Sequence, residues 1–125
     1  MENKYNFLIV EDDNISTKLI SVYINRMSNK IFYAKNGFDA IEICKKNPEI
    51  DIILMDIKMP FLDGYNTTKK IREFNKNVFI VAQTSFSTKE DKDLAIEVGC
   101  NVYISKPYSS EDLISLIQEK FIRNK

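Results

Sequence analysis

The chain contains Ile52-Ile53-Leu54-Met55-Asp56, four apolar residues that end in a carboxylate. Two other runs have a similar form: Phe7–Val10 leads into Glu11-Asp12-Asp13, and Val102–Ser105 leads into Lys106-Pro107. Short β-branched runs bounded by polar residues are typical of buried strands in a parallel sheet. In an open α/β sheet, ligands bind beyond the carboxyl ends of the strands. We therefore expect the acidic residues and Lys106 to meet in one crevice.

The crowding of carboxylates at that edge predicts a bound cation. Carboxylates that lie close together resist ionisation unless a positive charge joins them, and an all-oxygen site favours a hard metal ion such as Mg2+. Lys106 then needs an anion of its own, for which a phosphoryl oxygen is the obvious candidate. The pattern thus predicts a metal site next to a phosphoryl site.

Size and composition indicate one domain over residues 1–125. The 18 basic and 18 acidic residues balance, so no overall field would attract the chain to nucleic acid or to anionic lipid. The apolar stretches are short and no signal-type segment opens the sequence, which predicts a soluble, cytoplasmic protein with no membrane partner.

Cysteine and histidine usage narrows the chemistry further. Cys44 and Cys100 lie on apolar-patterned segments, as expected of reduced core thiols. The chain has no histidine, which excludes a Ser-His-Asp triad, a histidine metal ligand and a phosphohistidine made on this chain.

Hydrophobic periodicity alternates between strand and helix along the whole chain. Strands are expected at Phe7–Val10, Ile31–Ala34, Asp51–Met55, Val78–Ala82 and Val102–Ser105. Helices are expected at Asn14–Met27 with Ile15, Leu19 and Val22 on one face, after Asn36 with Phe38, Ile41 and Cys44, and at Tyr65–Phe74 with Ile71 and Phe74 inward. Two more are expected after the candidate caps Thr88 and Ser109, carrying Leu94, Ala95 and Val98, and then Leu113, Leu116, Ile117 and Phe121. This alternation predicts a three-layer α/β sandwich of five strands and five helices.

Asp56 is the most informative single residue, because a carboxylate at the end of an apolar strand is costly unless that edge uses it. It could instead cap a turn or a helix. Glu11, Asp12 and Asp13 could serve a helix dipole, but one acid is enough for that purpose, and Asp13 is the one we assign to it.

Lys106 precedes a proline, which favours an extended backbone and sends its side chain beyond the sheet edge. Thr84 and Ser85 add hydroxyl donors after the fourth strand. A metal held by carboxylates, a lysine and a hydroxyl could neutralise a phosphoryl group while an aspartate oxygen attacks in line to give an acyl phosphate. These strand ends together therefore describe a phosphoryl site.

Three segments resemble the receiver domains of two-component response regulators. They are Phe7–Asp13, Leu54–Gly64 with its Met-Pro and Asp-Gly pairs, and Tyr103–Tyr108, so that the resemblance extends over the whole chain. It implies a doubly wound, flavodoxin-like (βα)5 fold with strand order 2-1-3-4-5, which receivers share with flavodoxins. The stretches Ala82–Phe86, Val98–Asn101 and Ile104–Pro107 are most similar to receivers attached to hybrid sensor histidine kinases.

The resemblance also implies roles for individual residues. Asp56 would accept the phosphoryl group, with Glu11, Asp12 and the backbone carbonyl of Lys58 completing a Mg2+ site. Thr84 would be the switch hydroxyl, Lys106 the lysine that pairs with the phosphoryl group, and Tyr103 the switch aromatic.

The implied function is a phosphorylation-dependent signalling switch. The donor would be a phosphohistidine of a histidine kinase or of a histidine phosphotransfer domain, in a Mg2+-dependent reaction that the domain itself catalyses, with slow autodephosphorylation. The output partner would bind the face of the fourth helix, fifth strand and fifth helix, through Leu94, Tyr103 and Tyr108. Lys58 and Phe86, two positions after Asp56 and Thr84, could screen the attacking water.

Two other functions remain open at this point. A phosphohydrolase of the haloacid-dehalogenase type also uses a strand-end aspartate, but such enzymes require a second acidic residue at the position of Lys58. An interaction module that keeps only the fold would have no need for the acids, Thr84 and Lys106 together. The chain could be a stand-alone regulator or a domain of a larger kinase.

Overall fold

The computed structural model describes residues 3–85 and 88–123. It contains one parallel sheet in the order β2-β1-β3-β4-β5, as the sequence predicted. The strands are β1 (Tyr5–Val10), β2 (Ser28–Ala34), β3 (Ile52–Asp56), β4 (Phe79–Thr84) and β5 (Val102–Ser105). The helices are α1 (Asn14–Ile24), α2 (Gly37–Lys46), α3 (Gly64–Arg72), α4 (Lys89–Val98) and α5 (Ser110–Ile117), with short 3-10 and π segments η1 (Asn25–Met27) and η2 (Gln118–Ile122).

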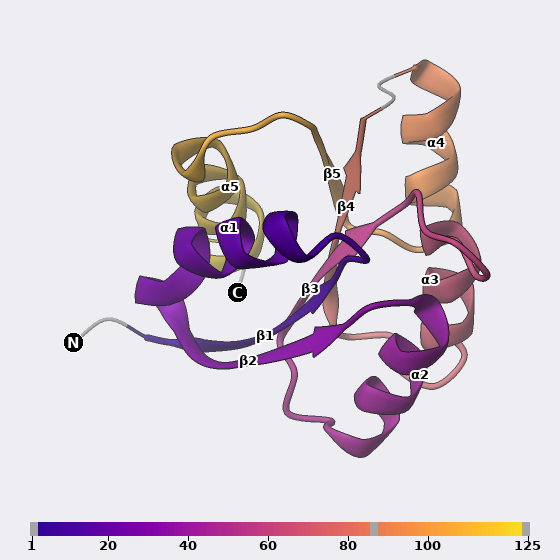
Figure 1. The fold of residues 1–125 in the computed structure, drawn as a ribbon, viewed down its shortest axis with the longest axis horizontal. Coiled ribbons are helices and arrows are strands. Elements are labelled where there is room, and N and C mark those ends of the chain that lie inside the picture. Colours follow the sequence, from indigo (N-terminus) through magenta and orange to yellow (C-terminus); the bar gives the residue numbers. More distant parts are fainter. Residues whose placement is uncertain (1–2, 86–87, 124–125) are drawn as a thin grey trace.

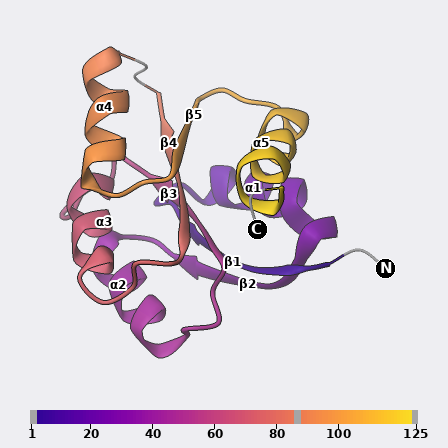
Figure 2. The ribbon, with the colours of Figure 1, turned by 180° about the vertical axis from the view of Figure 1, so that it is seen from behind.

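The helices cover both faces of the sheet, which confirms the three-layer (βα)5 fold. In Figure 1 and in the reverse view of Figure 2, α1 and α5 lie on one side, and α2, α3 and α4 lie on the other. Alternate residues of each strand enter two separate cores, because side chains in a strand point alternately to its two faces. On β3, Ile53 and Met55 face α2–α4, whereas Ile52 and Leu54 face α1 and α5.

Helix ends follow the sequence signals closely. The side chains of Asn36, Asp63, Thr88 and Ser109 each accept a hydrogen bond from a backbone N–H in the first turn of the following helix. Ser109, a candidate cap in the sequence, forms a capping box with Asp112. Helix α4 ends at Gly99, whose φ of 117° glycine adopts without a side-chain clash.

The buried face of α1 was predicted wrongly. Ile15, Leu19 and Val22 are 78%, 50% and 72% exposed, and the helix contacts the sheet through Ile20 and Ile24 instead. The helix carries apolar residues on two faces, and spacing alone does not say which face covers the sheet. It is also shorter than predicted, because η1 replaces its last turn and β2 begins at Ser28.

Two aromatic residues were also predicted on the wrong face. Phe38 is 58% exposed and Phe74 is 41% exposed. Helix α2 buries Gly37, Ala40 and Cys44, whose small side chains let it approach the sheet closely. The ring of Phe74 instead forms a cation–π contact with Lys45, whose Nζ lies 5.5 Å from the ring centroid.

Among the described residues, no helix has both the length and the apolar character that a membrane crossing requires.

Candidate functional site

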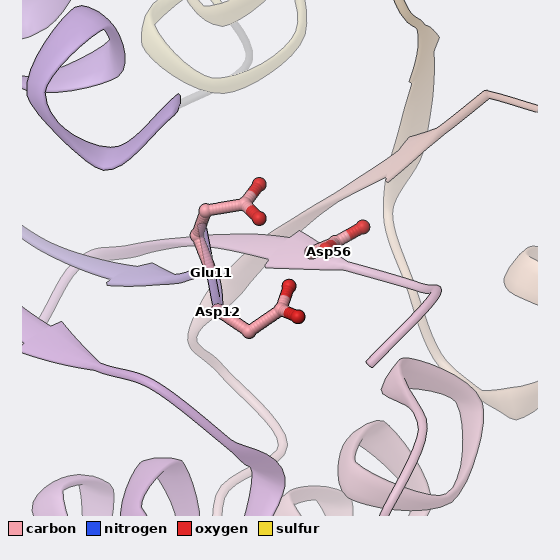
Figure 3. A group of neighbouring side chains, drawn as sticks. All are labelled: Glu11, Asp12 and Asp56. Atoms are coloured by element: carbon pink, nitrogen blue, oxygen red, sulfur yellow. The ribbon is translucent and has the colours of Figure 1, made fainter. Parts of the chain in front are cut away.

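Three carboxylates meet beyond the ends of β1 and β3. Glu11 and Asp12 follow β1, and Asp56 is the last residue of its neighbour β3. Each offers one carboxylate oxygen within 4.8 Å of the other two, and Figure 3 shows the three side chains around a common space. Glu11 and Asp56 are buried, whereas Asp12 is exposed and connects the cluster to solvent. Such a set of oxygen donors fits a hard divalent cation.

Lys106 reaches this cluster from the end of β5, the strand at the edge of the sheet. Its Nζ lies 3.0 Å from Oε1 of Glu11 and 3.4 Å from Oδ1 of Asp56. Lys106 follows β5, which lies two strands away from β3, so the contact depends on the sheet order that was predicted. The ammonium partly neutralises two buried carboxylates that would otherwise repel each other.

The electrostatics of the cluster are far from those of free side chains. Burial and the charge of Glu11 raise the pKa of Asp56 from 3.8 to about 7, although Lys106 opposes them. Burial acts to lower the pKa of Lys106, but Asp56 and Glu11 outweigh it and the pKa is raised. The charged form of Asp56 is therefore disfavoured, and binding of a second cation or neutralisation of the carboxylate would stabilise the site.

Asp13 has the structural role that we assigned to it. Its side chain caps α1 by accepting a hydrogen bond from Ser16 N at 2.8 Å. The Ser16 hydroxyl donates to the same carboxylate at 2.7 Å, and these two bonds hold the Asp13 pKa below its usual value. The acidic run thus divides between a helix cap and the carboxylate cluster.

Thr84 and Tyr103 lie on the other side of the sheet edge. Thr84 ends β4, and it borders a cavity of about 470 Å³ that is also lined by Lys58 and Asp91. Tyr103 is half-buried against the core under α2–α4, and Lys92 Nζ lies 4.9 Å from its ring centroid. The structure therefore gathers Glu11, Asp12, Asp56 and Lys106, and it leaves Thr84 and Tyr103 in a neighbouring compartment.

Lys58 sits where a backbone ligand was expected. Its side chain is exposed, and its backbone N–H donates to Oδ1 of Asp56 at 3.3 Å. Its main chain thus runs directly beside the carboxylate cluster. Phe86, which we expected to influence the attacking water, lies outside the described residues.

Two residues beside the cluster were not identified from the sequence as part of the site. Gln83 is completely buried on β4, and the hydroxyl of Tyr108 donates a hydrogen bond to its Oε1. We had expected Tyr108 on the face of α4, β5 and α5, but its ring packs near Tyr23 of α1. A glutamine inside an otherwise apolar strand was the available signal.

Residues 7–118 match the model of the response regulator receiver domain. A probable transcriptional regulator, ycf29 of Porphyra purpurea, is 32% identical over 122 residues, which are 96% of this chain and 58% of the relative. Hybrid signal transduction histidine kinase M of Dictyostelium discoideum is 36% identical over 124 residues, or 94% of this chain and 5% of the kinase. The chain thus spans less than two thirds of these relatives.

Solved structures agree with the sequence relatives. The receiver domain of Ssk1, in its complex with the histidine phosphotransfer protein Ypd1 from Saccharomyces cerevisiae, superposes with a TM-score of 0.89 at 32% identity, covering 99% of this chain and 93% of that one. The CheX-CheY-BeF3-Mg2+ complex from Borrelia burgdorferi gives 0.90 at 26% identity, covering 95% and 90%. These matches set the dehalogenase-type alternative aside. The chain belongs to the response regulator family as a receiver domain, with the acidic cluster and Lys106 at the carboxyl edge of its sheet.

Proposed function

We propose that this domain accepts a phosphoryl group on Asp56 from a phosphohistidine of a partner protein or domain, in a Mg2+-dependent reaction. The observation that carries the proposal is the buried contact of Lys106 with both Glu11 and Asp56, next to the exposed carboxylate of Asp12. Charge of both signs at one solvent-connected strand end is costly to build and is typical of a site that handles an anion with a metal.

The chemistry assigns a role to each member of the cluster. A carboxylate oxygen of Asp56 attacks phosphorus, the P–N bond of the donor breaks, and its electron pair leaves with the imidazole nitrogen. Bound by Glu11, Asp12, Asp56 and the carbonyl of Lys58, Mg2+ would neutralise part of the phosphoryl charge. Lys106 binds a phosphoryl oxygen as a point charge, which stabilises both the transition state and the acyl phosphate.

The response would arise on the other side of the sheet edge. The Thr84 hydroxyl moves toward the phosphoryl group, and Tyr103 fills the space that Thr84 leaves. The cavity beside Thr84 provides room for this movement. The face of α4, β5 and α5, with Leu94 and Tyr103, then changes its affinity for an output protein or domain. Slow hydrolysis of the acyl phosphate by the domain itself resets the switch.

The partner class follows from the composition and the relatives. The chain has no histidine, so the phosphohistidine must belong to another protein or domain, such as a histidine kinase or a phosphotransfer domain. The receiver of Ssk1 is bound to such a phosphotransfer protein in its solved complex. The buried thiols of Cys44 and Cys100, whose pKa values burial raises to about 12 and 11, fit a reducing compartment, and we place the domain in the cytoplasm.

Intact-mass measurement after incubation with a small phosphodonor tests the proposal. We expect the mass of one phosphoryl group to appear with Mg2+ and to be absent with excess chelator. Asp56→Asn should abolish the uptake, whereas Asp63→Asn, which keeps a good N-cap on α3, should not change it. Uptake by Asp56→Asn at the normal rate, or no uptake by the parent domain, contradicts the proposal.

A further inference from the structure

Gln83 is a buried polar residue whose amide is only half satisfied. Its side chain has no exposed surface, and its Oε1 accepts the hydrogen bond from Tyr108. Its Nε2 has no hydrogen-bond partner among the described residues. An unpaired buried donor destabilises the folded state, so an apolar residue here would give a more stable strand. A role other than stability would explain why an amide is present.

The position of Gln83 places it directly beside the phosphoryl site. The register of β3 and β4 pairs Gln83 with Asp56, and Ile57 N donates to Gln83 O at 3.1 Å. Paired residues of these strands point to the same face: Leu54 and Val81, the pair two residues earlier, both lie in the core under α1 and α5. The Gln83 amide therefore lies next to Asp56 in the layer that also holds Glu11 and Lys106.

Tyr108 approaches the same layer from the loop after β5. Burial, and then the charges of Glu11, Tyr23 and Asp56, raise the pKa of its hydroxyl, as expected of a phenol close to the carboxylate cluster. Only Pro107 separates Tyr108 from Lys106. The segment is thus attached to β4 at two points: Lys106 N donates to Thr84 O at 2.8 Å, and the Tyr108 hydroxyl donates to Gln83.

We propose that Gln83 and Tyr108 are positioning residues, which fix the Lys106 ammonium against Asp56 by anchoring the segment Lys106–Tyr108 to β4. The consequence for phosphorylation rests on the function proposed above, whereas the placement of Lys106 does not. The contacts form a closed circuit. Asp56 contacts Lys106, the chain leads from Lys106 to Tyr108, and Tyr108 is hydrogen-bonded to Gln83, which is paired with Asp56 on the neighbouring strand.

Packing against the core and Tyr23 covers only part of Tyr108, which is half-buried. One side of the ring borders an open cavity of about 470 Å³, whose walls include Leu19, Ile20, Tyr23 and Pro107. The ring could swing into this space, and the backbone next to Lys106 would follow it. The hydrogen bond to Gln83 removes that freedom because it fixes the far end of the ring to the sheet.

Three variants separate positioning from packing: Tyr108→Phe, Gln83→Met and the double variant. Each keeps nearly the same side-chain volume. Replacing both partners by apolar groups should leave the free energy of unfolding, measured in urea, equal to that of the parent or higher. The maximal rate of phosphorylation by acetyl phosphate in Mg2+ should nevertheless fall by about three- to tenfold in all three. The half-saturating donor concentration should change less than the rate.

The rates of the three variants should also be coupled. Since both substitutions break the same contact, the double variant should be no slower than the slower single variant. Tyr33→Phe is the matched control: it removes a half-exposed hydroxyl on the edge strand β2, which shares a hydrogen bond with Ser21 of α1, and it should leave the rate unchanged. A double variant with the parental rate, or rates that follow the loss of stability, would overturn the proposal.

NMR of the lysine side chains provides a readout that needs no phosphorylation. The Lys106 methylene signal next to Nζ is the one missing in Lys106→Met, and it should shift in Tyr108→Phe and in the double variant but not in Tyr33→Phe. If this signal shifts while the parent takes up no phosphoryl group, the placement of Lys106 is supported and the proposed function fails. If the parent is phosphorylated and the signal stays in place, the positioning role fails.

Discussion

The two sides of the sheet edge differ in how their side chains are held. On the side of α1 and α5, Glu11, Asp56 and Lys106 contact one another directly and are largely buried. On the side of α3 and α4, Thr84 borders a cavity and Tyr103 lies under the ammonium of Lys92. The first side has the charged contacts that the proposed phosphoryl and metal site requires, whereas the second has open space beside Thr84. The difference suggests that chemistry and response are divided between the two faces of one sheet.

Asp56→Asn and Lys106→Met should change stability more than the other single substitutions discussed here, and in opposite directions. The folded domain holds the Asp56 proton up to about pH 7, because its pKa is raised from the ordinary value of 3.8, so the folded state binds more protons between these values. The stability that this group contributes is therefore lost as pH rises through that window. Asparagine stays neutral, and without metal the variant should be more stable than the parent by about 2–4 kcal/mol at pH 8, with no difference near pH 4.

Urea unfolding from pH 4 to pH 8 in a chelator measures this effect. Mg2+ should stabilise the parent but not the variant, because it binds only where the carboxylate is present. A stability difference that does not depend on pH would mean that Asp56 is not strained by its surroundings, and the two sides of the edge would then be equivalent.

Lys106→Met should act in the opposite direction on the same side. The variant leaves Glu11 and Asp56 buried without the cation that lies between them, and we expect a loss of about 3 kcal/mol at pH 8. Saturating Mg2+ should restore part of this loss, since a second cation neutralises the same carboxylates. Thermal unfolding with and without Mg2+ tests this, and a loss that Mg2+ leaves unchanged would point to packing of the lysine stem instead.

The sequence predicted contacts that follow from strand ends and sheet order better than contacts that depend on tertiary packing. Glu11, Asp56 and Lys106 could be placed together because strand ends and sheet order determine where they lie. Gln83 could not be placed in the site, because a hydrogen bond across two strands and a loop depends on tertiary packing. The exposed faces of α1 and α2 were misjudged for a related reason: Ile15 and Phe38 have the right spacing for burial, and only the docking of each helix decides which apolar side it buries.

The loop between β3 and α3 allows a test with a smaller expected effect on the side of α3 and α4. Phe61 has a φ of 72° and is 89% exposed, so it adopts a left-handed backbone without burying its ring. Phe61→Gly removes the steric penalty, although glycine gains entropy in the unfolded chain, and the net gain should be about 0.5–1 kcal/mol. Urea unfolding measures it, with Phe38→Ala as the control for loss of an exposed ring. A destabilised Phe61→Gly would mean that the ring holds the loop in place.

Lys92→Met should change stability by no more than Phe61→Gly does, and it should have the most specific effect on Tyr103. Removing an ammonium 4.9 Å from the ring centroid should cost about 0.5–1 kcal/mol, the usual strength of a partly exposed cation–π contact. Methionine still covers the ring, so the loss is electrostatic, and Lys69→Met on the exposed surface of α3 controls for the change in charge. If the Lys92 contact restrains Tyr103, the NMR signals of its ring should broaden or shift in Lys92→Met alone. Unchanged ring signals would show that the core itself holds Tyr103. Tyr103 would then be as firmly fixed as the charged side chains on the side of α1 and α5.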